Sequence, residues 1–282
     1  MLQNQTFSLN CNGRLVELSA PKIMGILNLT PDSFSDGGRF NNEKAALAQT
    51  EKMIAEGADI IDIGPQSTRP GAQYLSADQE IERLGSLIRT LKTHFPQTLI
   101  SIDTFWGKTV AFAHDQGADI VNDISAGQFD PELIPQVIQS GLPYILMHSN
   151  ASHQTMHHQI KYEAIALSVN RFLLDKASEL LKLGLKDLIL DPGFGFGKTI
   201  EDQYTLLENT RQIGWGRFPV LIGISRKSFI YKPLNKTPND IVEETQKLHL
   251  KALSQGAKIL RVHDVKETKA TINYWKTTLQ SQ

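Results

Sequence analysis

Polar side chains that could bind a ligand follow apolar segments at many points in this sequence. One set carries amides or carboxylates, which can hydrogen-bond the edge of a flat polar heterocycle. Its members are Asn28, Asp103, Asn122 and Asp191. Another set brings positive charge, and the donor fork of arginine matches a phosphate or carboxylate. Its members are Arg69, Lys227, Arg261 and His263. A helix cap or a solvated surface position would explain any one of them, but together they predict a site that binds a heterocycle and an anion.

Three glycine-containing loops accompany these residues. The loop at 28–38 exceeds the roughly 2–6 residues usual after a strand, and Gly37 and Gly38 would let it move as a lid; an ordinary capped turn is the alternative. In the loop at 67–71, the arginine precedes a proline, which favours an extended backbone. The loop at 191–198 alternates three glycines, which allow close backbone approach, although the spacing of a P-loop is absent.

The apolar segments predict the elements that would position these side chains. The sequence pattern at 57–63 recurs at 117–123 and 256–262, with a looser copy at 184–191. Each initial glycine would end a helix in the left-handed conformation, and the apolar run after it would enter a buried strand. Strands are expected at 23–27, 59–63, 99–102, 119–121, 144–147, 187–190, 220–224 and 258–262. Helices are expected at 43–56, 77–94, 106–116, 131–140, 162–183, 200–212, 239–255 and 265–278.

Eight apolar strands alternating with helices predict an α/β fold, a single (β/α)8 TIM barrel spanning residues 1–282. A short β-hairpin within residues 1–20, turning at Asn12-Gly13, would close the bottom of the barrel. In such a barrel, polar residues at the carboxyl ends of the strands face the active site. A doubly wound open sheet is the alternative, but it would usually carry a Gly-rich dinucleotide loop, which we do not find.

Composition argues against several other classes of protein. The formal net charge is −1, so no basic field suggests nucleic acid or an anionic membrane as a partner. The lone cysteine, Cys11, cannot form an internal disulfide, and we expect a structural role for it in a reducing cytoplasm. No apolar run approaches the ~18 residues needed to span a membrane. The first ten residues also lack the pattern of a signal peptide.

The polar residues lie in motifs that resemble those of the dihydropteroate synthases, the folate-pathway enzymes targeted by sulfonamides. The resemblance extends over residues 23–268 and rests on the order and placement of five motifs. They are MGILNLTPDSFSDGG at 24–38, STRPG at 67–71, DPGFGFGK at 191–198, SRKS at 225–228 and RVHD at 261–264.

The resemblance implies a transferase that joins 6-hydroxymethyl-7,8-dihydropterin pyrophosphate to 4-aminobenzoate, releasing 7,8-dihydropteroate and pyrophosphate. By position in the motifs, the pterin would be bound by Asp103, Asn122, Asp191 and Lys227. The anion would be bound by Arg69, Arg261 and His263. Thr68 would lie near the substrates, Ser228 near the aminobenzoate carboxylate, and Asn28 would bind Mg2+ with the pyrophosphate. The resemblance further implies a cytoplasmic homodimer whose partners are small molecules.

In the implied chemistry, pyrophosphate leaves before the amine attacks, which creates a cationic pterin methylene. Asp103 would stabilise that cation, whereas Mg2+, Arg261 and His263 would stabilise the departing anion. The implied catalytic residues are therefore Asp103, Lys227, Arg261 and His263. The loops at 28–38 and 67–71 would close over the substrates and exclude water.

Two segments depart from the pattern common in that family. Pro65-Gln66 stands where many relatives carry Gly-Glu, and Ser149-Asn150 stands where a methionine and a glycine-containing turn are frequent. The family pattern therefore does not carry over to the geometry of the loop at 67–71, to the rim after the fifth strand or to the response to sulfonamides. A pterin-binding methyltransferase barrel is one alternative, but it would not need an anion pocket. A non-catalytic pterin-binding barrel is another, but it would be expected to lose the cation-stabilising or metal-binding groups.

Overall fold

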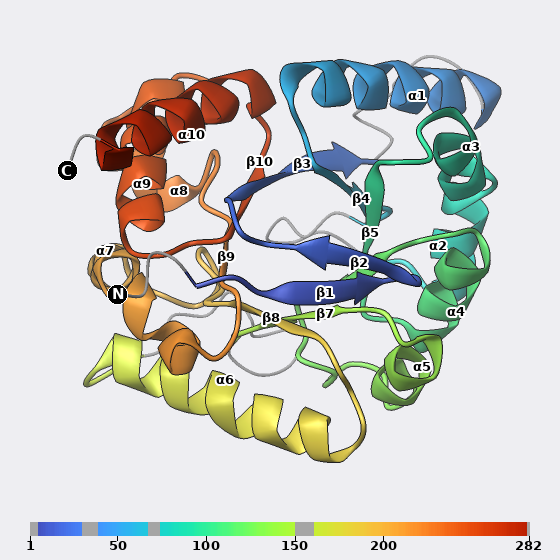
Figure 1. Cartoon of the computed structure of the whole chain (residues 1–282), viewed down its shortest axis with the longest axis horizontal. Helices are drawn as coiled ribbons and strands as arrows, with labels where there is room; N and C mark the ends of the chain where they lie inside the picture. The colour runs from blue at the N-terminus through green and yellow to red at the C-terminus, as the bar shows by residue number, and fades with distance from the viewer. Residues whose placement is uncertain (1–4, 30–38, 67–73, 150–160, 281–282) are drawn as a thin grey trace.

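Parallel strands surrounded by helices make up the chain (Figure 1), of which the computed structural model describes residues 5–29, 39–66, 74–149 and 161–280. The barrel strands are β3 (Lys22–Asn28), β4 (Ile60–Gly64), β5 (Leu99–Asp103), β6 (Ile120–Asp123), β7 (Tyr144–Met147), β8 (Leu188–Asp191), β9 (Leu221–Ile222) and β10 (Ile259–Val262). Their spatial order is β8-β7-β6-β5-β4-β3-β10-β9. An isolated parallel bridge from Leu190 to Val220 links the two edge strands, so the sheet forms the predicted barrel with nearly complete closure.

Helices follow the strands and cover the outside of the barrel (Figure 1). They are α1 (Arg39–Glu56), α2 (Ala77–Leu84), α3 (Leu87–His94), α4 (Gly107–Asp115), α5 (Leu133–Ser140), α6 (Ile165–Lys182), α7 (Ile200–Glu208), α8 (Ser228–Tyr231), α9 (Val242–Ser254), α10 (Val265–Gln280) and the 3-10 helix η3 (Thr210–Gly216). In the described part of the chain, no helix combines the length and apolar character needed to cross a bilayer.

Three predicted elements were wrong in their extent. The helix expected at 77–94 is two helices, because Gly85 has φ 52° and ψ −122°, which no helix continues through. The helix expected at 200–212 ends at Glu208 and gives way to η3, whose last residues turn at Gly214 with φ 65°. The strand expected at 220–224 is reduced to β9 and the isolated bridge at Val220, and the short helix α8 was not predicted.

The repeated glycines end four helices as the sequence pattern predicts. Gly57, Gly117, Gly184 and Gly256 have φ between 94° and 106°. The N–H of the residue after each glycine donates to a carbonyl five residues earlier, as from Ala58 to Met53. This bond is typical of a Schellman helix end. The same local turn therefore feeds four barrel strands at their amino ends.

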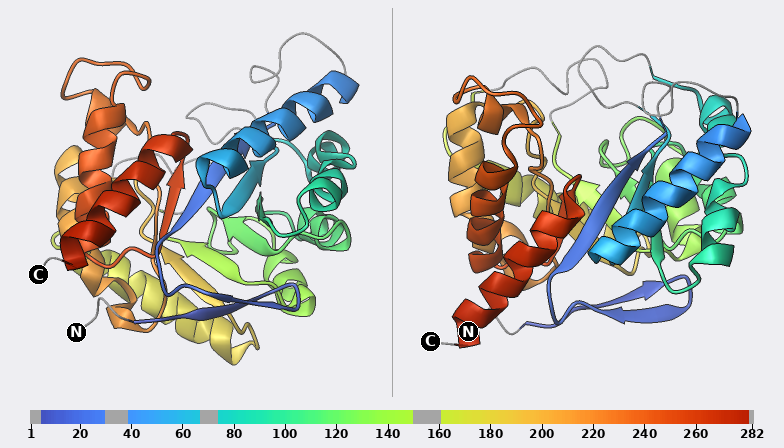
Figure 2. Two further views of the ribbon diagram at one scale, coloured as in Figure 1. Left: turned by 45° about the horizontal axis from the view of Figure 1, so that its top comes forward. Right: turned by 90° about the horizontal axis from the view of Figure 1, so that it is seen from above.

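An apolar layer and the N-terminal hairpin close the bottom of the barrel. One inward residue from each strand contributes: Met24, Ile60, Leu99, Ile120, Ile145, Ile189, Leu221 and Ile259. The hairpin of β1 (Ser8–Cys11) and β2 (Arg14–Glu17) turns at Asn12 and Gly13, both at positive φ, and lies across that end (Figure 2). Cys11 packs into this layer, and burial raises the pKa of its thiol to about 12, which suits the expected structural role.

Candidate active site

Two polar layers lie inside the barrel, above the apolar layer. Because strand side chains alternate between faces, residues two positions beyond the apolar layer also face inward. These are Asp62, Ser101, Asn122, Asp191 and Arg261, each following its apolar partner by two residues. The second polar layer lies two residues closer to the carboxyl ends of the strands and contains Asn28, Asp103 and His263. Strand periodicity thus brings together most of the residues that the sequence singled out.

Arg261 joins two carboxylates at the centre of these layers. Its Nε donates to Asp62 Oδ2 at 2.6 Å, and its Nη2 donates to Asp103 Oδ2 at 2.8 Å. Asn122 Nδ2 donates to the same Asp62 oxygen at 3.1 Å. Buried charges require partners of this kind. The arginine predicted for an anion pocket therefore already neutralises part of the carboxylate charge around the residues predicted to bind the pterin.

Asp103 is the carboxylate of this cluster nearer the barrel mouth. Its side chain is 11% exposed, whereas that of Asp62 is 0% exposed. Burial raises the pKa of Asp103, Arg261 opposes the rise, and the carboxylate of Asp62 adds to it. Asp103 is thus a carboxylate held at high energy in its charged form, so a cation placed beside it would be strongly favoured.

Lys227 and Asp191 form a second charged group on the opposite side of the barrel interior. Lys227 Nζ donates to the Phe194 carbonyl at 2.7 Å and lies 4.6 Å from the centre of the Phe196 ring. Burial lowers the pKa of Lys227 to about 8, and Asp191 opposes that shift. Burial also raises the pKa of Asp191, although the Gly193 N–H bonds its carboxylate at 2.7 Å.

The backbone at Arg226 determines which of the two adjacent cations enters the site. Arg226 has φ 58°, a left-handed conformation uncommon for a residue with a side chain. Its guanidinium bonds Asp264 through Nη2 at 2.6 Å and Asn239 through Nη1 at 2.9 Å. Arg226 therefore meets its own acid, which leaves Lys227 to face Asp191.

His263 lies on the side of the site predicted to bind the anion. Its Nδ1 lies 3.1 Å from Ser225 Oγ, which also accepts the His263 backbone N–H at 3.2 Å. Burial, together with the positive charges of Arg226 and Arg261, lowers the pKa of His263 to about 4. The ring is thus a neutral hydrogen-bonding group at pH 7 until an anion binds beside it.

The glycine loop after β8 is held by a buried lysine. Lys198 Nζ donates to the carbonyls of Gly193 at 2.7 Å, Phe196 at 3.1 Å and His148 at 3.4 Å. A Cβ on Gly193 would lie 1.9 Å from the His148 carbonyl oxygen, so only glycine fits there. Burial lowers the pKa of Lys198 to about 7. The loop is therefore fixed where it carries the Phe194 carbonyl to Lys227.

Asn28 stands at the end of β3, close to the acidic side of the site. A Cβ built on Gly64 would meet Asn28 Oδ1 at 3.2 Å and Asp103 Oδ2 at 3.9 Å, so glycine leaves open the space between them. In the described part of the chain, no cluster of three His, Cys, Asp or Glu could hold a metal by itself. An amide oxygen at the mouth instead suits Mg2+ that takes its other ligands from phosphates and water.

Thr68 and Arg69 lie outside the described residues, as does most of the loop at 28–38. Gln66, just before the loop at 67–71, is described. Its side chain bonds the backbone N–H of Leu75 at 3.2 Å and Glu80 Oε1 at 2.5 Å. Glu80 is fully buried and also accepts the Thr104 hydroxyl at 2.6 Å. The glutamine of the unusual Pro65-Gln66 pair thus ties the end of β4 to α2 and β5.

Sequence reasoning missed Asp62, the fully buried acid that contacts Arg261 and Asn122. The internal repeat contained the signal, because Asp62, Asn122 and Arg261 occupy equivalent positions in the copies at 57–63, 117–123 and 256–262. It also missed Ser225, the partner of His263, and Lys198. Ser228 was predicted near an aminobenzoate carboxylate; it begins α8 directly after Lys227 and is partly exposed.

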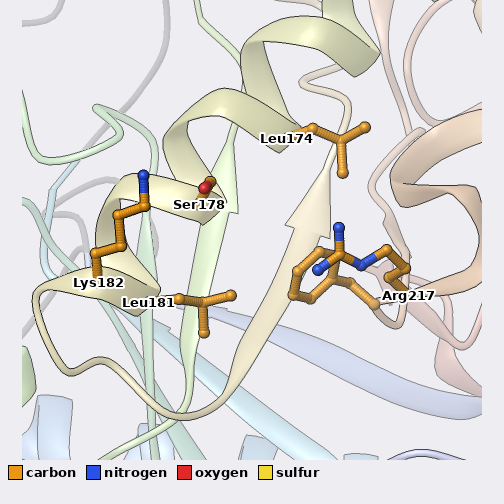
Figure 3. A pocket seen from close by; sticks show the side chains of 6 residues that line it. Leu174, Ser178, Leu181, Lys182 and Arg217 are labelled. Atoms are coloured by element: carbon orange, nitrogen blue, oxygen red, sulfur yellow. The ribbon is translucent and has the colours of Figure 1, made fainter.

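A surface hollow of about 260 Å³ lies elsewhere, between α6 and the segment before β9 (Figure 3). Leu174, Ser178, Leu181 and Lys182 line it from the helix, and Arg217 and Phe218 line it from the other side. Residues 217 and 218 precede β9, so this hollow lies toward the amino ends of the strands. Barrel enzymes carry their chemistry at the opposite ends, and the polar layers are the better candidate.

Comparisons with known proteins identify the family of the chain. The sequence model of the family described as pterin binding enzyme matches residues 24–263. A dihydropteroate synthase of Haemophilus influenzae is 40% identical over 272 residues, covering 96% of this chain and 98% of that protein. A solved dihydropteroate synthase of Xanthomonas albilineans with 4-aminobenzoic acid is 34% identical, with a TM-score of 0.90 over 98% of this chain and 99% of that one.

The same Xanthomonas albilineans enzyme has also been solved in complex with 7,8-dihydropteroate. That structure is 33% identical to this chain, with a TM-score of 0.85 over 97% of this chain and 99% of that one. The identity, the coverage and the shared barrel agree with the motif order found in the sequence. The chain belongs to the dihydropteroate synthase family of transferases.

Proposed function

We propose that this chain condenses 6-hydroxymethyl-7,8-dihydropterin pyrophosphate with 4-aminobenzoate, forming 7,8-dihydropteroate, pyrophosphate and a proton. The observation that carries the proposal is the Asp62–Arg261–Asp103 cluster beside Asn122, which offers acidic and cationic groups within one small site. The relatives solved with 4-aminobenzoic acid and with 7,8-dihydropteroate support the choice of substrates.

The inner side of the site is suited to the pterin. Asn122 and Asp191 offer a buried amide and a buried carboxylate, and Lys227 brings its ammonium group beside them from the segment after β9. A pterin ring displays donors and acceptors along its edge, which such groups can pair with when water is excluded. We assign the heterocycle to these residues and to Asp103.

The outer side is suited to the reaction itself. The carbon–oxygen bond of the pterin methylene breaks, and its electron pair leaves with pyrophosphate. Asp103 stabilises the methylene cation, while Arg261 and His263 hydrogen-bond the departing anion. The aminobenzoate nitrogen then forms the new bond to the methylene and loses a proton. In this proposal, Arg69, Thr68 and Ser228 bind near the aminobenzoate and the anion.

Mg2+ fits the proposal through Asn28, whose Oδ1 faces the open space at Gly64. When bound, the ion would neutralise charge on the pyrophosphate oxygens. Asn28 supplies one oxygen ligand, and the substrate would complete the coordination. The roles of the other residues do not depend on that ligation.

A dropout assay tests the proposed reaction. Purified protein should release pyrophosphate in multiple turnovers when pterin pyrophosphate, 4-aminobenzoate and Mg2+ are all supplied. Omitting any one of them should reduce release to the background rate. Absence of turnover in the complete mixture would rule the proposal out, whereas release that does not need 4-aminobenzoate would indicate a hydrolase.

Replacing Lys227 with alanine should weaken binding of a dihydropterin by about 1.5–3 kcal/mol, the scale of one hydrogen bond to a charged group. Lys227 lies beside Asp191 and is fixed by the Phe194 carbonyl, so the loss should appear in affinity. Isothermal titration calorimetry measures it directly. Lys232→Ala is the matched control, because that lysine is exposed and lies just after α8. Equal affinity in Lys227→Ala and wild type would remove Lys227 from the pterin site.

A further inference from the structure

Asp62 is a buried carboxylate that does not face the barrel mouth yet contacts two residues of the site. Its Oδ2 accepts from Arg261 Nε at 2.6 Å and from Asn122 Nδ2 at 3.1 Å. Its Oδ1 is buried and has no hydrogen-bond partner among the described residues. The side chain of Asp62 is 0% exposed, and a buried carboxylate with one oxygen unpaired lowers the stability of the fold. Stability therefore does not explain why an aspartate stands at this position.

The charge balance of the cluster indicates what Asp62 contributes. Arg261 contacts both Asp62 and Asp103, so its single positive charge is shared between two negative ones. With Asp62 present, the cluster keeps one net negative charge beside the pterin. Without it, Arg261 would neutralise Asp103, and a developing cation would gain little from the cluster.

We propose that Asp62 is a positioning residue for the transferase reaction: it holds Arg261 by Nε and offsets its charge, so that Asp103 stays effectively negative toward the pterin methylene. The inference rests on the proposed function. It differs from the roles assigned to Asp103 and Arg261, because Asp62 acts only through those two residues.

The direction of the contacts supports this role. Asp62 binds the Nε edge of Arg261 from the deeper polar layer, and Asp103 binds Nη2 from the layer above. The guanidinium is therefore anchored at its inner edge by Nε, and its Nη2 lies toward the barrel mouth. An arginine fixed in this way can hydrogen-bond a departing anion without first being ordered.

Asp62→Asn is an unusually clean test, because it can remove the charge and keep the contacts. The asparagine oxygen can take the place of Oδ2 and accept from both Arg261 and Asn122. Its NH2 group then takes the place of Oδ1, which has no partner among the described residues. Asp62→Ser removes the charge as well and serves as a second variant if the first is too unstable to purify.

The expected result is a lower kcat with a nearly unchanged affinity for the dihydropterin. Loss of one charge near the reacting centre should lower kcat by about 10-fold to 100-fold. Affinity for a dihydropterin without pyrophosphate, measured by calorimetry, should change by less than about threefold, because that ligand carries no developing cation. A purely structural role would lower the melting temperature without this difference between kcat and affinity.

The pH profile gives a second readout. The charged groups that act on Asp103 are Arg261, which lowers its pKa, and Asp62, Glu80 and Asp123, which raise it. Removing the charge of Asp62 should therefore lower the pKa of Asp103. The acid limb of kcat/KM should move to lower pH in Asp62→Asn.

Asp59→Asn is the matched control, since Asp59 lies just before β4 and bonds Lys22 and the Ile23 N–H at the bottom of the barrel. It should leave kcat and the acid limb unchanged. If wild type turns over but Asp62→Asn keeps its kcat and its acid limb, the inference is wrong and the proposed function stands. If wild type itself shows no turnover, the proposed function fails and the inference fails with it.

Discussion

Asp103→Asn should lower kcat by about 10²–10³-fold, the scale for one lost electrostatic group at a reacting centre. The asparagine oxygen can still accept from Arg261 Nη2, so the geometry of the cluster should survive. What disappears is the negative charge that faces the methylene as pyrophosphate leaves. Steady-state kinetics with saturating substrates measures the change.

The pH dependence should change in the same variant. The charged form of Asp103 is the active one, and burial raises its pKa, so wild-type activity should fall as the pH drops through that raised pKa. The fall should occur above pH ~4, the usual value for an aspartate. In Asp103→Asn this acid limb should be absent.

A buried acid at the other end of the barrel provides the control for Asp103→Asn. Asp119 bonds Lys92 and the Ile100 N–H below the polar layers. Asp119→Asn should reduce stability and leave kcat near the wild-type value. A wild-type rate in Asp103→Asn, or an equal loss in both variants, would contradict the catalytic role.

Arg261→Leu should have the second large effect, on stability. It leaves Asp62 and Asp103 buried without a counter-charge, and breaking a buried pair in this way costs about 3–5 kcal/mol of unfolding free energy. Urea denaturation at pH 7–8 measures the loss as a lower midpoint. Arg211→Leu is the control, because Arg211 is exposed and bonds only the Ser254 carbonyl among the described residues.

The sign of the pH dependence distinguishes lost charge pairing from lost packing in Arg261→Leu. Without the arginine, which lowers the pKa of Asp103, that carboxyl should have a folded-state pKa still further above its unfolded value. The penalty is then full above the folded pKa and disappears as the pH falls toward the unfolded value near 4. A midpoint difference that is equal at pH 5 and pH 8 would mean that Arg261 acts through packing.

Periodicity explains why much of the fold and half of the site were predictable. The glycine at the start of each repeat ends a helix, and in the three closest copies the apolar residue three positions later enters the bottom layer, as with Gly57 and Ile60. Two residues further, the chain must face inward again, which places Asp62, Asn122 and Arg261 in one layer. The repeat alone therefore predicts an inward-facing position for Asp62.

Other features depend on tertiary structure and leave no mark in the sequence pattern. Nothing local predicts that Arg226 adopts φ 58° and turns toward Asp264 while Lys227 enters the site. The bond from Gln66 to Glu80 depends on where α2 docks, and the break at Gly85 determines that position. The pairing of Arg261 with two acids likewise depends on barrel closure, which places β10 close to β4 across β3.

The most direct test of the account is to identify the product of the complete reaction. Pterin pyrophosphate labelled with ¹⁸O in the bridging carbon–oxygen bond is incubated with the protein, 4-aminobenzoate and Mg2+, and both products are analysed by mass spectrometry. Cleavage of the carbon–oxygen bond should give dihydropteroate and pyrophosphate in equal amounts, with all of the label in pyrophosphate. Failure to form dihydropteroate, or label retained on the pterin, would contradict it.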